Sequence, residues 1–509
     1  MNNKQQKRPK TAPASAGPAA PTAATPREFS VAHADNDRPA PAAPSRMTQV
    51  RQWKVTARKP ELIKVTDRIY SAVNYALSNV LFVITDASVV VIDTTESLKT
   101  ARACFNEFRK LCQLPVSYII YTHFHGDHVR GASVFHEPGT KIIAQKAMPE
   151  EREKMLDLFG YRARVDALQF GASLDKQARA ISLACHPEKG RAHPDGVFKD
   201  RAHFQDGGYI PPHILFDEEF KFEEGGVVFE LYHTEGETHD HLMVWLPREK
   251  TLFPGDLFYA AFPMLGNPMK PDRPILAWAE SIERMRALRP EYMVPSHSQP
   301  REGAAAIDEV LANYARAIRH VHAETIRLIN EGRSFDEVRR RVKLPADLAK
   351  LPYLREGYGK VDWAAASVFR QNTGWYSFNP KDLKPLRPGV LARAVLEAVG
   401  GADSLLRRAR RAIREEMPQL ALELTDIVLK ARPLHPTGRQ VKARALRLLA
   451  TRTPNRVERN LYLAEAKAAS RWLPPIAKGE PRQRGHEKRR LQNRVCRQRI
   501  GPGRDEAAK

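Results

Sequence analysis

The chain has little cysteine and no long apolar segment. Four cysteines occur among 509 residues and none forms a CxxC pair, so neither a disulfide framework nor a cysteine zinc site is supported. The longest apolar runs, such as residues 80–84, fall far short of the roughly 18 residues that span a bilayer. We therefore expect no membrane partner. Because no secretory signal is recognisable, we expect a cytoplasmic location, with a processed leader as the alternative.

The positive charge is concentrated outside the histidine-rich part of the chain. The net charge is +23, yet residues 51–300 carry −2 and contain twelve of the seventeen histidines. Residues 301–470 carry +13 and residues 471–509 carry +8. Phosphate affinity comes from Lys and Arg, so we expect no nucleic-acid groove in the histidine-rich part. A cation-binding site followed by a basic scaffold is the natural interpretation.

Composition and periodicity divide the chain into four parts. Residues 1–50 include 19 Ala or Pro at positions 11–45 and are predicted to form a disordered arm. Over 51–302, strand-like runs alternate with helical spacing, which predicts an α/β layered domain. Residues 303–473 repeat apolar side chains every three or four positions and are predicted to be all helical. The polar, basic residues 474–509 are predicted to be a disordered tail.

One histidine-rich motif follows the best strand candidate. Residues 115–122 are rich in β-branched and aromatic side chains, and residues 123–128 read HFHGDH. Alternate residues of an extended backbone point the same way, and glycine allows the chain to turn into a helix. Imidazoles and carboxylates without cysteine suit Zn²⁺ or a similar divalent ion. The alternative, a surface histidine cluster, is disfavoured by the strand-then-turn context. The motif offers four ligands: His123, His125, Asp127 and His128.

This motif is the HxHxDH signature of the metallo-β-lactamase fold, and residues 60–300 resemble that superfamily. The resemblance implies an αββα sandwich with further metal ligands on later loops. Asp256, after an apolar strand candidate, resembles the aspartate that bridges two metals, and His297 resembles the last metal histidine. Alone, Asp256 could be a helix N-cap and His297 an ordinary loop histidine, but their order along the chain supports the metal assignment.

The third ligand of the first metal departs from the commonest pattern. Residues 234–241 read TEGETHDH, and Glu237 stands where most superfamily members have a histidine, 19 residues before Asp256. A glutamate at this place resembles the alkylsulfatase branch of the superfamily. It adds negative charge and should make the metals weaker Lewis acids. The competing ligands are three nearby histidines: His233, His239 and His241.

The helical part is similar to the alkylsulfatase dimerisation domain. The similarity covers about 308–470 and rests on residues 313–330 and 352–361, on the GWYSFNP turn at 374–380 and on GGAD at 400–403. Family members pair their subunits through this region, so the resemblance implies a homodimer. The alternative is a packed helical bundle without a partner.

Two sulfate-holding motifs of that family are altered. The family's Tyr-Gly-Asn stretch is matched by residues 169–172, which read QFGA, and its Arg-Gly stretch by residues 265–270. Lys270 or Arg273 is the candidate substitute for the missing arginine, although lysine lacks arginine's bidentate fork. The sequence therefore supports the metal site more strongly than a sulfate ester substrate.

Together these residues predict a binuclear metal-dependent hydrolase that resembles alkylsulfatases and cleaves an alkyl sulfate or a related small anionic ester. Two Zn²⁺ ions per subunit are expected, with Mn or Fe as alternatives. Asp127 is also the candidate catalytic residue, because it could steer a proton. The resemblance assigns His123, His125 and Glu237 to metal one, Asp127, His128 and His297 to metal two, and Asp256 to both.

Two other functions compete with this prediction. Another hydrolase of the same fold, acting on a thioester, lactone or phosphodiester, is favoured by the altered sulfate motifs. A nucleic-acid binder would use the basic helices and the tail. Residues 482–499 hold eight Lys or Arg side chains but no aromatic residue to stack bases. Such a run is usually a solvated end, so we expect no specific nucleic-acid binding.

Overall fold

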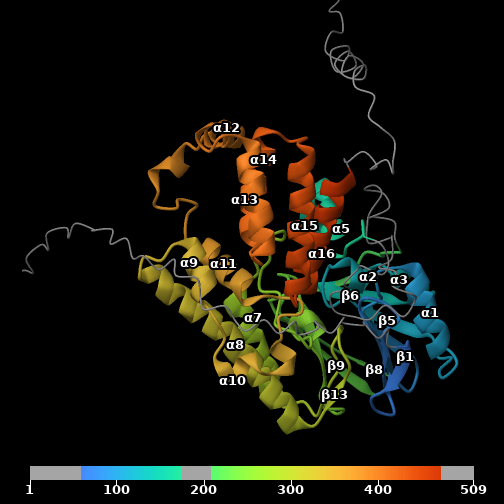
Figure 1. Ribbon diagram of the computed structural model, residues 1–509. Helices are drawn as coiled ribbons and strands as arrows, with labels where there is room; N and C mark the ends of the chain where they lie inside the picture. The colour runs from blue at the N-terminus through green and yellow to red at the C-terminus, as the bar shows by residue number, and fades with distance from the viewer. Residues whose placement is uncertain (1–58, 175–207, 472–509) are drawn as a thin grey trace, which may run out of the picture. The chain divides into compact units, whose positions relative to one another are not determined.

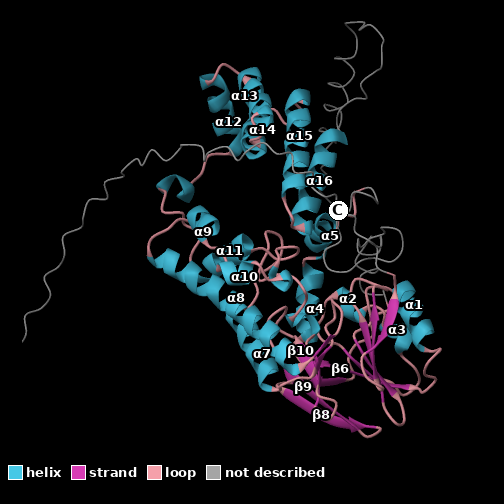
Figure 2. Ribbon diagram, turned by 60° about the horizontal axis from the view of Figure 1, so that its bottom comes forward, coloured by secondary structure: helices cyan, strands magenta, loops and turns pink. Residues whose placement is uncertain are grey.

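The computed structural model describes residues 59–174 and 208–471 (Figure 1). The predicted arm at 1–50 and the predicted tail at 474–509 lie outside the described residues. The described part contains two β-sheets and a long series of helices (Figure 2). The prediction of an α/β sandwich followed by an all-helical region is confirmed.

The first sheet has seven strands in chain order. The first four pair antiparallel, and a hairpin joins β3 to β4, with Ile84 opposite Val89. From β4 onward the pairs are parallel, so crossover segments must carry the chain back between strands. The strands are β1 (Glu61–Lys64), β2 (Ile69–Val73), β3 (Val80–Ile84), β4 (Val89–Ile92), β5 (Val116–Ile120), β6 (Lys141–Gln145) and β7 (Ile214–Phe216). The described helices between them are α1 (Leu98–Phe108), α2 (Gly126–Val129), α3 (Ala132–Phe135), α4 (Met148–Asp157) and α5 (Phe159–Gln169).

The second sheet has six strands in the order β13-β12-β11-β10-β9-β8. Neighbours pair antiparallel except β11 and β12, which are parallel and are connected through α7 (Ile275–Ala287). The strands are β8 (Glu219–Glu224), β9 (Val227–His233), β10 (Leu242–Leu246), β11 (Thr251–Phe253), β12 (Tyr292–Met293) and β13 (Arg301–Glu302). A short 3-10 helix, Gly255–Leu257, follows β11 and carries Asp256.

Alternation along the strands sorts the core into layers. In β3, Phe82 packs with α1 and α3, whereas the next-door Leu81 packs with the second sheet. In β10, Val244 belongs to the core between the sheets, and Met243 packs with α7 and α8 (Ala304–Asn330). Figure 2 shows α1 and α3 against the strands of the first sheet. The layers are therefore helix, sheet, sheet and helix, as the resemblance implied.

Helices fill the described chain after β13. They are α8 (Ala304–Asn330), α9 (Phe335–Arg341), α10 (Ala346–Ala349), α11 (Val361–Asn372), α12 (Pro388–Ala398), α13 (Ala402–Arg414), α14 (Pro418–Ala431), α15 (Pro436–Arg452) and α16 (Arg456–Arg471), with 3-10 helices at Pro352–Leu354 and Pro380–Leu383. Gly332, with φ of 73°, follows the end of α8 as a C-terminal glycine should. None of the helices in the described ranges has both the length and the apolar composition of a membrane span.

One apolar core joins the sandwich to the first of these helices. Trp278 of α7 and Trp363 of α11 belong to the same buried cluster as side chains of β10 and β11. The backbone N–H of Gly359 donates to the carbonyl of Phe262 (3.2 Å). A Cβ at position 359 would lie 2.1 Å from a backbone oxygen, so only glycine permits this approach. Helices α12 to α15 bury a separate cluster. The domain boundaries stay predictions.

Candidate metal centre

The histidine motif forms the turn between β5 and α2. His123 and His125 lie in the turn, and α2 begins at Gly126 and carries Asp127 and His128. The backbone N–H of His128 donates to the carbonyl of His125 (3.0 Å), which closes the turn. The predicted path from strand through turn to helix is confirmed.

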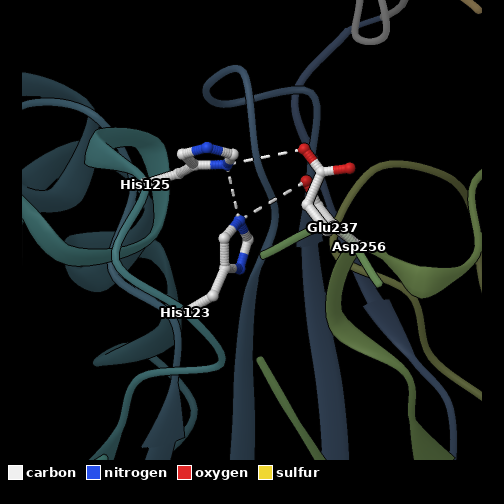
Figure 3. Close-up of side chains that lie close together, drawn as sticks. All are labelled: His123, His125, Glu237 and Asp256. Carbon is white, nitrogen blue, oxygen red and sulfur yellow. Dashed lines mark hydrogen bonds and ion pairs between the residues drawn. The ribbon is translucent and has the colours of Figure 1, made fainter. Parts of the chain in front are cut away.

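A first group of side chains converges from three parts of the chain: His123, His125, Glu237 and Asp256 (Figure 3). The distances are 2.8 Å between His123 Nε2 and His125 Nδ1, and 3.5 Å between His125 Nδ1 and Glu237 Oε1. His123 Nε2 lies 3.8 Å from Asp256 Oδ2. One ligand atom of each residue lies within 4.8 Å of the others, so a single cation could contact all four.

A second group adjoins the first and consists of Asp127, His128 and His297. Asp127 Oδ2 lies 3.3 Å from His297 Nε2 and 3.5 Å from His128 Nε2. Asp256 contacts this group as well, at 3.2 Å from His297 Nε2 and 3.5 Å from His128 Nε2. The structure thus brings together all seven residues predicted as metal ligands, with Asp256 between the two groups. Their role as ligands stays a prediction.

The donor atoms of this centre fit a divalent cation. Asp256 Oδ1 is buried and lies 3.2 Å from His297 Nε2 without the geometry of a hydrogen bond, which is unusual for a buried carboxylate oxygen. The two groups supply imidazole nitrogens and carboxylate oxygens and contain no thiol, a set that suits a divalent metal of intermediate hardness. The residues present therefore fit a divalent metal cofactor.

A buried aspartate outside the predicted set orients the second group. Asp93, which directly follows β4, accepts a hydrogen bond from Ser296 Oγ (2.8 Å), and its Oδ2 lies 2.7 Å from His128 Nδ1. His297 Nδ1 lies 2.8 Å from the Leu77 carbonyl oxygen. Such partners fix the ring orientation and leave the other nitrogen free for a metal. Sequence reasoning missed Asp93, whose signal was an acidic residue at the end of a buried strand.

The three histidines that competed with Glu237 lie outside both groups. His241 is buried, but its Nε2 accepts a hydrogen bond from the backbone N–H of Asp256 (3.1 Å). Burial lowers the pKa of His241 to about 3, which keeps the ring neutral for that contact. His239 is exposed, and His233 Nε2 lies 2.7 Å from the His239 carbonyl oxygen. Glu237 is the residue of this loop that reaches His125.

Opposite charges dominate the electrostatics of the second group. Burial alone would raise the pKa of Asp127, but His128 and His297 hold that pKa well below its usual range. Burial likewise opposes protonation of His297, yet Asp256 and Asp127 raise its pKa to about 10. In the first group, burial lowers the pKa of His123 well below its usual value. Because metals bind deprotonated ligands, a cation held by this group would displace the proton of His297.

Glu237 forms a bidentate pair with Arg273. Each carboxylate oxygen accepts a hydrogen bond from one terminal nitrogen of the guanidinium, and both side chains are buried. Burial raises the pKa of Glu237 to about 7, although Arg273 lowers it. Arg273, which was predicted to bind the substrate, thus forms an ion pair with Glu237, which was predicted to bind a metal.

Two further positively charged side chains, Lys270 and Arg162, lie near the first group. Neither side chain forms an ion pair with any described residue, and Nη1 of the buried Arg162 has no hydrogen-bond partner there. After burial, Lys270 is the largest influence that lowers the pKa of His125, and Arg162 adds to it. Tyr161 Oη donates to the Met269 carbonyl (2.8 Å) and ties α5 to the loop of Lys270. Sequence reasoning predicted Lys270 and missed Arg162, which no motif marks.

Comparison with known proteins places this architecture in a family. The metallo-beta-lactamase superfamily model matches residues 75–168 and 170–297, and the alkyl sulfatase dimerisation model matches residues 334–471. A linear primary-alkylsulfatase from a Pseudomonas strain is 30% identical over 390 residues, which are 74% of this chain and 71% of that protein. An (R)-specific secondary-alkylsulfatase from Pseudomonas is 26% identical, and an alkyl/aryl-sulfatase from Saccharomyces cerevisiae is 25% identical. Each match covers 81% of this chain, and 63% and 64% of those proteins.

A solved structure shares the fold. The stereoselective inverting sec-alkylsulfatase Pisa1 from Pseudomonas superimposes with a TM-score of 0.72 at 24% identity, over 82% of this chain and 66% of that one. Fold and site define a hydrolase of the metallo-β-lactamase superfamily. The chain belongs to the alkylsulfatase family, as the sequence resemblance implied, and is an alkylsulfatase-like hydrolase. It spans about two thirds of the length of these relatives.

Proposed function

We propose that the chain hydrolyses an alkyl sulfate, or a closely related anionic ester, with two divalent cations per subunit. The observation that carries the proposal is the pair of ligand groups that share Asp256. Zn²⁺ is the expected ion because imidazole and carboxylate ligands suit it, and Mn or Fe are the alternatives. Lys270 is proposed to offset the negative charge of the ester, because its ammonium group has no ion-pair partner among the described residues.

The residues of the chain divide the chemistry among them. Divalent cations bound at the two groups would supply Lewis-acid charge and lower the pKa of water towards neutrality. Asp127 stays charged because His128 and His297 hold its pKa low, so it can accept a proton. Lys270 and Arg162 lie on the side of His125, where they favour an anionic group. Attack at carbon would place the oxygen of water in the alcohol product. Attack at the sulfur of the ester would place it in the released sulfate.

A sulfate-release assay on dodecyl sulfate, with metal content measured on the same sample, tests this proposal. We expect metal-dependent release and close to two equivalents of metal after mild purification. Hydrolysis in ¹⁸O-labelled water then assigns the attacked atom. His125→Ala should remove activity and lower the metal content while the protein stays folded. Less than one equivalent of metal in the wild-type protein would contradict the binuclear centre.

A second candidate is another hydrolase of the same fold, and the altered sulfate motif favours it. The side-chain amide of Gln169 in this motif donates to Tyr358 Oη (3.3 Å), and the backbone carbonyl of Gln169 accepts from Asn460 Nδ2 (2.8 Å). This stretch therefore contacts the C-terminal region. The corresponding motif of the family would instead hold the sulfate group. Thioesters, lactones and phosphodiesters assayed beside dodecyl sulfate would separate the two candidates. The absence of specific nucleic-acid binding stays a prediction, as does the cytoplasmic location.

The chain is further proposed to form a homodimer through its C-terminal region. Trp375 is 77% exposed and Phe378 is 86% exposed, and Leu383 and Leu386 beside them are exposed too. Exposed apolar clusters of this kind mark interaction surfaces. The four residues lie within the stretch matched by the dimerisation model. We therefore expect a second copy of this chain to cover these four side chains.

A further inference from the structure

The end of the loop that follows Asp256 is anchored to α11. Asp272 accepts hydrogen bonds from Ser367 Oγ and from the Arg370 guanidinium, which lie one turn apart on that helix. The side-chain amide of Gln371 donates to the Arg273 carbonyl oxygen (2.6 Å). A helix of the C-terminal region thus holds both the side chain of Asp272 and the backbone of Arg273.

Arg273 reaches from this anchor to the metal centre. Its guanidinium holds both oxygens of Glu237 and lies 5.6 Å from the centre of the Trp278 ring. A bidentate pair fixes the position and the rotation of a carboxylate together. Trp278 Nε1 donates to the carbonyl of Leu257 (2.9 Å), the residue after Asp256. One connected set of side chains therefore supports both carboxylates of the first group.

The charge of the first group explains why such a support is needed. With a glutamate in place of the usual histidine, the group holds two carboxylates and two imidazoles. Arg273 contributes one positive charge and offsets one of the two carboxylates. The group together with Arg273 therefore has the same net charge as a site of three neutral imidazoles and one carboxylate. A buried carboxylate is unfavourable without a compensating partner, and Glu237 is 4% exposed.

We infer that Arg273 is a positioning residue of the metal centre and that α11 sets its position. The inference rests on the proposed metal site and extends it: a helix of the dimerisation region governs how tightly the first group binds its cation. Arg273 acts through Glu237 and does not touch the reacting atoms. The partners of metal-binding side chains commonly influence metal affinity in this way.

The test measures the affinity of the full chain for Zn²⁺ by competition with a chromophoric chelator. Arg273→Met removes the charge and the fork, whereas Arg273→Lys keeps the charge and loses the fork. We expect one of the two Zn²⁺ ions, the one at the first group, to bind about 10–100-fold less tightly in both variants, as is usual when the partner of a ligand is lost. Wild-type affinity in Arg273→Lys would show that charge alone acts and would overturn the positioning role.

Gln371→Leu tests the contribution of α11 without touching the centre. Gln371 is exposed, so the protein should still fold. Loss of its single hydrogen bond to the Arg273 carbonyl should weaken Zn²⁺ binding by about fivefold. Asn372→Ala is the matched control, because the Asn372 amide bonds to Val368 within the helix (2.8 Å), and it should match the wild type. If Arg273→Met does not fold, Gln371→Leu decides, and unchanged affinity there overturns the inference.

Sulfate release measured on the same samples separates this inference from the proposed function. Zinc binding that depends on Arg273, without sulfate release by the wild type, would contradict the proposed substrate and support the inference. Sulfate release by the wild type, with zinc affinity insensitive to Arg273, would overturn the inference alone. Circular dichroism and melting of the metal-free variants confirm that the compared proteins are folded.

Discussion

The sandwich and the C-terminal helices depart from the ordinary rule of burial in opposite directions. In the sandwich, carboxylates are buried, since Asp93, Glu237 and Asp256 are at most 4% exposed. After α11, large apolar side chains are exposed, with Trp375 and Phe378 as the extreme cases. Buried polar groups and exposed apolar patches are the informative exceptions in a folded protein. The first exception fits a cation and the second fits another copy of the chain.

The largest effect should come from the carboxylate that contacts both ligand groups. Asp256→Asn keeps the shape and removes the charge, so both cations should be lost and sulfate release should fall about 100-fold or more. Metal analysis and the sulfate assay measure these losses. Asp240→Asn is the control, because Asp240 is a buried acid outside both groups. Equal metal loss in the two variants would show that buried acids in general, and not the shared one, hold the cations.

A smaller and graded effect should follow from pH. Burial would lower the pKa of His297, but Asp256 and Asp127 raise it to about 10, so its imidazole is protonated at neutral pH before metal binds. Metal binding at the second group would release this proton. The carboxylates Asp256, Asp93 and Asp127 also raise the pKa of His128 against the effect of its burial, so affinity should fall by at least about tenfold for each unit that the pH drops below these pKa values. Calorimetry in buffers of different ionisation enthalpy counts the released protons. An affinity for metal that stays constant from about pH 6 to about pH 8, the physiological range, would contradict the expected proton release.

The smallest effect on the metal centre should come from the exposed apolar cluster. The double variant Trp375→Asp and Phe378→Asp should turn a dimer into monomers, because it places charges on the proposed contact surface, and should leave the metal content near that of the wild type. Light scattering after size-exclusion chromatography measures the subunit number. Leu111→Asp is the control, since Leu111 is 60% exposed on the sandwich and should tolerate the change. A double variant that remains dimeric would remove this segment from the interface.

Contiguous features of the fold and the site could be predicted from the sequence. The predicted ligands from His123 to His128 lie on one turn, strand-like runs alternating with helical spacing indicated an α/β layered domain, and the family resemblance implied the sandwich. Distant pairings could not be predicted, because they depend on tertiary contacts. His128 contacts Asp93, which lies 35 residues away in the sequence, and Arg273 pairs with Glu237, which lies 36 residues away. Spacing alone cannot tell whether an arginine near such a centre faces the substrate or a ligand, and Arg273 shows how both roles fit the same sequence position.

The apolar core that runs from β10 through α7 and α8 to α11 has an evolutionary consequence. The two segments that separate family models match share this packing, so each covers apolar side chains of the other. A chain cut after Glu302 would keep α7 but would expose to water the apolar side chains of this core that α8 and α11 cover. A relative without these helices would therefore need other side chains to cover that surface.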